Sequence, residues 1–259
     1  MTERFARLLS LPEPEVRLDE ASLLLAAHAY PGLDVSAELQ RLDALADRCY
    51  APTLDALVQH LFVDEGFAGN KSEYFDPRNS FLNDVVERRL GIPITLGVLA
   101  MEVGRRIGVP LWGVSMPGRF LLRDKVDQDL FLDPFARGAP LDSAGCEAAF
   151  RAMHGAETQF DPTFLEPAGA YSILARMLAN LKAIFLARRD RAGLAWVLRL
   201  RVEVPGIPID ERRELASALA SRGRFGDAAL QLEHLADLTP AAAGDKHRWA
   251  ATRLRARLN

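Results

Sequence analysis

Apolar residues recur at the spacing of an α-helix along most of this chain. The pattern covers residues 18–50, 168–187, 192–202 and 210–258, and breaks such as Pro31-Gly32 interrupt it. We therefore expect packing helices toward both ends of the chain, with a different architecture between them.

Residues 92–107 predict the central helix of the fold. Pro93 suits a first helical turn, because its missing N–H costs nothing there, and Gly108 supplies the left-handed residue that ends a helix. Gly97 and Gly104 lie in a line of minimal side chains on one face. A glycine inside a helix costs roughly 0.5–1 kcal/mol relative to alanine, so two of them indicate that another backbone packs closely on this buried helix.

Three short runs of large apolar residues follow this helix. They are LWGVSM, RFLLR and DLFLD, at residues 111–116, 119–123 and 129–133, with turn-forming residues between them. Such runs predict antiparallel strands. The fold class expected is α+β: a helix-rich core with a short antiparallel sheet, followed by an all-α tail.

Four phrases of this region resemble a known family. They are LFVDEGFAGN, DPRNSFLNDVVERRLGIPITL, RRIGVPLWGVSMPGRFLLR and DPF, and together they span Leu61 to Phe135. The ordered set is similar to the transglutaminase-like (papain-like) core of bacterial SirB-type proteins, where the core is joined to a tetratricopeptide (TPR)-like tail. The resemblance implies a core with N-terminal helices over residues 1–165 and a helical TPR-like domain over residues 166–259.

Residues 210–240 themselves resemble one tetratricopeptide repeat. Leu219 and Gly223 mark the end of a first helix and its turn, and the small residues Ala216 and Ala228 allow two helices to cross closely. The tail is therefore expected to consist of helix pairs.

The resemblance also allows the catalytic positions to be tested. Active relatives use a cysteine at the start of the central helix as nucleophile, a histidine on the next strand as base and an aspartate beyond it to orient the base. Here the first position corresponds to Pro93, with Thr95 the nearby hydroxyl, the second to Arg119 and the third to Asp133. Arginine does not give up a proton near neutral pH, so Arg119 cannot be the base. We expect a degenerate site without catalytic residues, in which Arg119 and Asp133 form an ion pair.

The remaining reactive side chains do not replace this triad. Cys49 and Cys146 lie outside the central helix and have no histidine at local spacing, which is typical of inert thiols. His28 sits among apolar residues, as a buried structural histidine does. No two histidines or cysteines have the spacing of metal ligands, so we expect neither a metal nor a cofactor.

Polar residues precede the central helix and allow two interpretations. Asn79, Asn83, Glu87 and Arg88 are candidates for lining a groove beside the end of that helix. Alternatively, the asparagines cap helices or bind neighbouring backbone, and Glu87 and Arg88 form an ordinary surface pair.

Charge is divided unevenly along the chain. Residues 1–165 hold 16 Lys+Arg and 25 Asp+Glu, whereas residues 166–259 hold 16 and 10. The arginines of the basic part are scattered at helical spacing with few aromatic residues between them, which favours a solvated face over a nucleic-acid site.

The chain also lacks the usual marks of export or membrane insertion. Two cysteines make no disulfide framework, the first residues lack the pattern of a secretory signal peptide, and the apolar run from Leu90 to Met101 is too short to span a membrane. These features predict a cytoplasmic protein without membrane contact.

Three functions stay open at this point. The favoured one is a non-catalytic interaction or regulatory protein that binds a protein partner through the groove, the TPR-like tail or both. The alternative is a hydrolase or acyltransferase that acts on peptide or amide bonds through Thr95 or an unrecognised residue, by a non-cysteine mechanism. The third is RNA binding by the basic tail. The lost triad weighs against the second function, and the scattered charge weighs against the third.

Overall fold

The computed structural model describes residues 1–258, except for the side chains of residues 242 and 243. The chain forms two compact units. Unit 1 contains Met1 and residues 11–177, and unit 2 contains residues 2–10 and 178–258. The division falls inside one helix, α8 (Ala170–Ala187), whereas the sequence prediction placed a boundary after residue 165 and assigned the first ten residues to the core.

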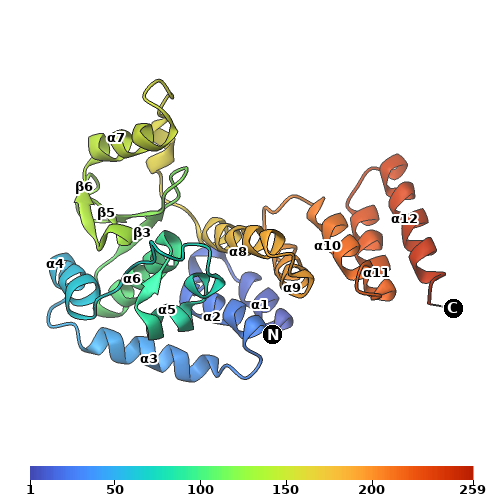
Figure 1. The fold of residues 1–259 in the computed structure, drawn as a ribbon, viewed down its shortest axis with the longest axis horizontal. Coiled ribbons are helices and arrows are strands. Elements are labelled where there is room, and N and C mark those ends of the chain that lie inside the picture. Colours follow the sequence, from blue (N-terminus) through green and yellow to red (C-terminus); the bar gives the residue numbers. More distant parts are fainter. Residues whose placement is uncertain (259) are drawn as a thin grey trace. The chain divides into compact units, whose positions relative to one another are not determined.

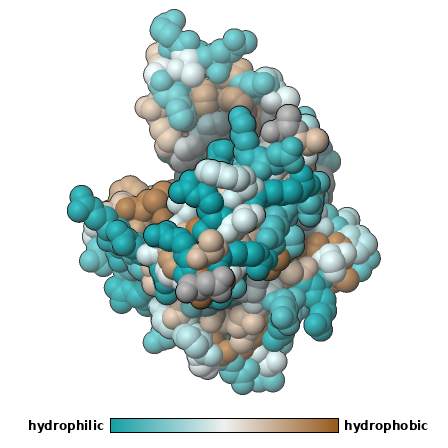
Figure 2. Space-filling view, turned by 90° about the vertical axis from the view of Figure 1, so that its right-hand side faces the viewer, coloured by the Kyte–Doolittle hydropathy of each residue, from teal (hydrophilic) through white to brown (hydrophobic). Residues whose placement is uncertain are grey.

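Unit 1 is built mainly from helices around one buried helix, α6 (Pro93–Ile107), as Figure 1 shows. Its other α-helices are α2 (Leu18–Ala29), α3 (Val35–Asp47), α4 (Leu54–Val58), α5 (Leu82–Arg88) and α7 (Ser143–His154). A π-helical turn, η2 (Gln59–Asp64), continues α4, and short 3₁₀ turns form η1 (Glu13–Glu15), η3 (Pro77–Ser80), η4 (Pro134–Ala136) and η5 (Pro162–Leu165). Helices α2 to α5 all contact α6, which explains why α6 carries so little polar surface. By contrast, the face of the molecule in Figure 2 is mostly hydrophilic, with small scattered hydrophobic patches.

The ends and the small-residue face of α6 follow from the sequence as predicted. A proline occupies its first position, and Gly108 closes it with a φ of +79°. An added Cβ would lie 2.5 Å from the ring of Phe120 at Gly97, and 2.7 Å from the carbonyl oxygen of Val109 at Gly104. Neither position has room for a side chain, so the close packing is confirmed, but the predicted approach of another backbone occurs at Gly104, whereas at Gly97 the neighbour is an aromatic ring.

The larger sheet of unit 1 is an antiparallel meander in the order β3-β4-β5-β6, and a second sheet pairs β1 (Ala68–Gly69) with β2 (Leu90–Gly91) in parallel. The strands of the larger sheet are β3 (Leu111–Val114), β4 (Leu121–Asp124), β5 (Phe131–Asp133) and β6 (Ala139–Leu141). The first three are the predicted runs, and they confirm the α+β fold class. The sequence did not predict β6, because Gly138 and Pro140 indicate a loop. Pro140 fits there because β6 is the edge strand, where a missing N–H breaks no ladder.

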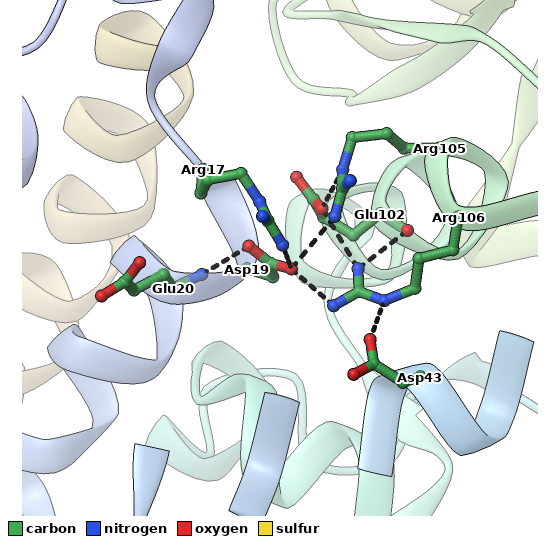
Figure 3. A network of polar contacts seen from close by, with 7 residues as sticks. All are labelled: Arg17, Asp19, Glu20, Asp43, Glu102, Arg105 and Arg106. Atoms are coloured by element: carbon green, nitrogen blue, oxygen red, sulfur yellow. Dashed lines mark hydrogen bonds and ion pairs between the residues drawn. The ribbon is translucent and has the colours of Figure 1, made fainter. Parts of the chain in front are cut away.

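A buried network of charged side chains ties α6 to α2, and Figure 3 shows it. Asp19 on α2 is completely buried and accepts hydrogen bonds from Arg17 at 2.9 Å and Arg106 at 2.7 Å. Glu102 lies beside it and accepts hydrogen bonds from Arg105 at 2.8 Å and Arg106 at 3.3 Å. Asp19 is polar and near the start of a helical pattern, and so a possible N-cap by sequence, but Arg17 holds the cap position of α2 and the Asp19 carboxylate bonds to Arg106 of α6.

Unit 2 is all-helical among its described residues. Besides the second part of α8 it contains α1 (Thr2–Leu9), α9 (Arg191–Arg201), α10 (Glu211–Ala220), α11 (Phe225–Asp237) and α12 (Ala241–Arg255). Helix α1 contacts α9, and the tail helices share an apolar core that includes Leu215, Ala216 and Ala228. The predicted helical tail is confirmed, while its relation to tetratricopeptide repeats stays a prediction.

Helix α8 is the one helix in residues 1–258 that is long and apolar enough to cross a membrane. The sequence predicts a helix here but did not indicate a membrane span, because Arg176 and Lys182 interrupt its apolar run. Ile173, Leu174 and Met177 on this helix are buried inside unit 1, as in the core helix of a globular protein. Length and composition alone therefore make only a weak case for a membrane span.

Candidate functional site

Arg119 and Asp133 form the ion pair that the sequence predicts. Arg119 lies between β3 and β4, Asp133 ends β5, and Nη1 of Arg119 donates to Oδ2 of Asp133 at 2.6 Å. The Arg119 side chain is 34% exposed and that of Asp133 is 8% exposed. The acid is therefore paired with a cation that does not accept a proton, and the pair cannot perform the proton transfer of a histidine–aspartate pair.

The second oxygen of Asp133 holds the chain that follows it. Oδ1 accepts hydrogen bonds from the N–H groups of Phe135 at 2.9 Å and Ala136 at 3.2 Å, and so caps η4. This turn contacts α6. Asp133 is thus fully used by the fold, whereas the buried Nε of Arg119 has no hydrogen-bond partner in the part of the chain that the structure describes.

Thr95 is completely buried in the first turn of α6. Its hydroxyl donates to the carbonyl oxygen of Asn79 at 2.6 Å and accepts the N–H of Ile92 at 3.2 Å. This hydroxyl therefore acts as a helix cap, and its bonds leave it unsuited to attack a substrate. Pro93, which the sequence resemblance matches to the nucleophile position, carries no reactive side-chain group.

Asn79 holds the preceding loop onto the start of α6. Its side chain is completely buried, accepts hydrogen bonds from Asn70 at 3.0 Å and Arg88 at 3.3 Å, and donates to the carbonyl oxygen of Glu73 at 2.7 Å. The bond to Glu73 is the contact with neighbouring backbone that the structural alternative describes, whereas the bonds from Asn70 and Arg88 come from side chains. Because Asn79 lies beneath the surface, it can shape a groove only through the loop that it holds.

The other three groove candidates lie on α5. Arg88 reaches Asp76 at 3.6 Å besides its bond to Asn79. Glu87 is exposed, and Asn83, one turn before it, is buried with an Oδ1 that lacks a partner among residues 1–258. The structure thus brings Arg88 and Asn79 together. A binding role for Asn83, Glu87 and Arg88 stays a prediction.

An aromatic cluster lies next to the ion pair, and the sequence did not reveal it. The ring of Phe135 packs onto Gly69, where a Cβ would overlap it. Tyr74 meets Phe135 edge to face with ring centres 5.8 Å apart, and Phe75 packs on Tyr74 at 5.3 Å. Phe75 is 72% exposed, so the cluster presents apolar surface. The EYF and DPF phrases contain these rings, but sequence alone could not show that the two phrases meet.

The cysteines are not placed for catalysis. Burial, with the nearby carboxylate of Asp142, raises the pKa of Cys146 to about 11, and this thiol packs in an apolar cluster with Phe150. The Cys49 thiol is half-buried and donates to the carbonyl oxygen of Ala51 at 3.4 Å. Thiolates, not thiols, are the reactive form, so Cys146 is inert at neutral pH. Residues 1–258 also contain no group of three His, Cys, Asp or Glu side chains that could hold a metal ion.

Comparison with known proteins supports the same family assignment. The family model described as "Transglutaminase-like superfamily" matches residues 32–179. A UPF0162 protein of Xylella fastidiosa is 38% identical over 242 residues, covering 88% of this chain and 82% of that protein. A UPF0162 protein of Pseudomonas aeruginosa is 33% identical over 196 residues, covering 72% of each chain.

A shorter similarity reaches eukaryotic proteins. F-box only protein 21 of Mus musculus is 36% identical over 103 residues, which are 36% of this chain and 16% of that protein. No solved structure matches the chain. The family model covers more than half of the sequence, and the Xylella protein is similar along most of its length. The chain therefore belongs to the transglutaminase-like superfamily.

Proposed function

We propose that this protein is a non-catalytic, SirB-type member of its superfamily that binds and regulates a protein partner in the cytoplasm. The observation that carries the proposal is the ion pair between Arg119 and Asp133 at the positions of the base and its orienting acid. This arrangement holds the acid but supplies no group that can take a proton from a nucleophile.

The energetic argument rests on the absence of both the cysteine nucleophile and the histidine base at the matched positions. Loss of general acid–base help alone slows such reactions by about 10²–10⁴-fold. Loss of the activated nucleophile also removes the covalent route, so that binding and oxyanion contacts offer only residual catalysis. Thr95 does not compensate, because its hydroxyl is buried and bonded at the start of α6. An enzyme of changed mechanism is therefore kept only as an outcome of the test below.

Two surfaces are available for a partner under this proposal. One is the region of unit 1 around Arg88, Glu87 and the exposed ring of Phe75. The other is the helical tail, which we propose to be TPR-like on the pattern of residues 210–240. Stacked helix pairs of that kind present extended binding surfaces.

The test has a chemical arm and a binding arm. Full-length protein is assayed for ammonia release from a glutamine-containing peptide and for hydrolysis of amide substrates, beside Thr95→Val, which keeps the shape of the side chain and removes the hydroxyl. We expect equal, background rates and no covalent labelling by an acylating probe. A wild-type rate clearly above that of a folded Thr95→Val variant would favour an enzyme.

The binding arm uses the tagged chain expressed at native level in its own cells. We expect one protein to co-purify in near-stoichiometric amount and to be absent from a tag-only control. Recovery of no specific protein would count against an interaction function.

A further inference from the structure

Unit 2 contains a pocket of about 610 Å³ between α10 and α12. Its apolar floor is formed by Ala216, Ala220, Leu232, Ala250 and Leu254. Its polar rim is formed by Arg213, Ser217, His247, Arg253 and Arg257, with Trp249 at the edge. All of these residues belong to unit 2, so the pocket is complete within that unit.

The rim is cationic, and of its arginines Arg213 pairs with the exposed carboxylate of Asp210 at 3.7 Å. The lining residues include three arginines and a histidine but no aspartate or glutamate. The guanidinium of Arg253 lies 4.7 Å from the ring centre of Trp249, and that of Arg257 lies 4.8 Å from the ring centre of Phe225. Within residues 1–258, no carboxylate pairs with Arg253 or Arg257. Ring stacking leaves the N–H donors of a guanidinium open to an acceptor.

Arginines of α12 outside the pocket form ion pairs with carboxylates. Arg255 pairs with Glu233 at 2.7 Å, and Arg248 lies within 3.4 Å of both Asp237 and Asp245. Among the described residues, Arg253 and Arg257 therefore place positive charge on the rim that no carboxylate balances, unlike the two arginines of α12 that lie outside the pocket. Unit 2 as a whole carries 17 Lys+Arg against 10 Asp+Glu, which adds a long-range attraction for anionic ligands.

We infer that this pocket binds an acidic, amphipathic segment of a partner protein. Aspartate or glutamate carboxylates, or a C-terminal carboxylate, would pair with Arg253 and Arg257, since the guanidinium fork matches a carboxylate with two hydrogen bonds. An apolar side chain of the segment would lie on the alanine and leucine floor, beside Trp249, which is 63% exposed. The inference rests on the proposed function and names the chemistry of its partner.

The floor favours a peptide over a nucleic acid. Single-stranded nucleic acids bind through a charged track with several aromatic platforms for successive bases, whereas this pocket has one exposed ring above an apolar floor. A floor of that kind is used by an aliphatic side chain, which gains free energy on leaving water.

The test measures fluorescence anisotropy of a fluorescein-labelled peptide rich in Glu and Leu, with a free carboxyl end, titrated with the full-length protein. The variants are Arg253→Gln, Arg257→Gln and the two combined, and the matched control for the single variants is Arg255→Gln, which removes one charge of the same type between these positions but outside the pocket. Comparison ligands are the peptide with Gln for Glu, the peptide with Ser for Leu, and a single-stranded oligouridylate.

We expect salt-sensitive binding that the double variant weakens by about tenfold or more, as for the loss of hydrogen bonds between charged groups, while Arg255→Gln binds like wild type. Both altered peptides should bind more weakly. Weakening in Arg255→Gln equal to that in the single variants, tighter binding of the oligouridylate, or no binding of the acidic peptide would each overturn the inference. Melting curves of every variant establish that it is folded.

The two proposals can fail separately. If the double variant still recovers the cellular partner as wild type does, the pocket is not the docking site and the interaction function stands. If wild type recovers no partner, the proposed function fails, whatever the synthetic peptide does.

Discussion

Replacing Asp19 with asparagine removes one charge from the interior of unit 1 at almost constant volume. The carboxylate is 0% exposed, and Figure 3 shows it between guanidinium groups that come from two segments. Its Oδ2 faces Arg17 and Arg106, and its Oδ1 accepts the N–H of Glu20 at 2.7 Å. The amide of an asparagine has only one oxygen, so its NH₂ group must face a donor on one side.

The expected magnitude follows from the exposure of each partner. Removing one member of a buried ion pair costs about 3–5 kcal/mol, because the other charge stays buried without compensation. Arg106 is 10% exposed but keeps its bonds to Glu102 and Asp43, so its charge stays partly compensated, whereas Arg17 is 46% exposed and counts little. The asparagine oxygen still accepts one hydrogen bond. We therefore expect the free energy of unfolding to fall by about 2–4 kcal/mol, and the melting temperature by roughly 5–15 °C.

The assay is thermal and urea unfolding followed by circular dichroism at neutral pH. The matched control is Asp43→Asn, because the carboxylate of Asp43 also bonds Arg106 at 2.7 Å but is 59% exposed. An exposed pair contributes less than about 1 kcal/mol, so this variant should melt close to wild type. A loss in Asp43→Asn as large as that in Asp19→Asn would refute the assignment of the stabilisation to burial.

The pH dependence of stability separates the two buried acids. Burial opposes the ionisation of Asp19, but hydrogen bonds from Arg17 and Arg106 outweigh it and hold the pKa of Asp19 below its ordinary value. A group whose folded pKa is lowered adds stability above its unfolded pKa of about 3.9, and this stability is lost as the pH falls through the folded pKa. The acid limb of the stability curve should therefore flatten in Asp19→Asn.

The pKa of Glu102 is shifted in the opposite direction to that of Asp19. Burial, and then the charge of Asp19, raises the pKa of Glu102, although Arg105 and Arg106 oppose the rise. Its protonated form adds stability that is complete below the unfolded pKa of about 4.3 and is lost as the pH rises through the raised folded pKa. Glu102→Gln should thus cost less at neutral pH than Asp19→Asn. An equal or greater cost would show that Asp19 is not the principal counterion of Arg106.

Two further predictions concern packing and reactivity. Gly97→Ala and Gly104→Ala should each destabilise the protein by about 1–3 kcal/mol. Gly104→Ala should cost more, because its Cβ would meet a backbone oxygen, whereas the Cβ at position 97 would meet a ring that can move. Gly226→Ala has its nearest atom at 3.7 Å and should stabilise the protein by about 0.5–1 kcal/mol, and melting temperatures would rank the three variants. Iodoacetamide at neutral pH should alkylate Cys49 in the native protein and leave Cys146 unmodified, because Cys146 is buried and burial raises its pKa to about 11. Peptide mapping that finds Cys146 alkylated as fast in the native protein as in urea would contradict this prediction.

Features of the fold that depend on local sequence were predictable. Pro93, Gly108 and the two helical glycines determine where α6 begins, ends and packs, and all of these cues lie within the helix or next to it. The strands of the meander were recognisable by their apolar runs. Strand β6 was not, because its pairing with β5 overrides the loop preference of Pro140.

Features that depend on contacts between distant segments were harder to predict. The Arg119–Asp133 pair was predictable because the family resemblance relates the two positions, which lie 14 residues apart. The burial of Asp19 depends on Arg106, 87 residues away, and periodicity cannot convey such a contact. For the same reason the sequence left two interpretations of Asn79 open, and the structure adds the hydrogen bonds by which its side chain holds the loop.

The presence of Asp133 is explained by the fold without any catalytic role. One of its oxygens caps η4 and the other neutralises Arg119, so its loss would leave two N–H groups and a partly buried guanidinium without partners. Such groups cost about 1–3 kcal/mol each when they are buried and unsatisfied. A histidine at position 119 would also not restore the active triad, because Pro93 offers no thiol and the hydroxyl of Thr95 is bonded to Asn79. Under the proposed assignment of the triad positions, activity would require a new nucleophile as well as a new base, and the presence of Asp133 alone is therefore no indication of an enzyme.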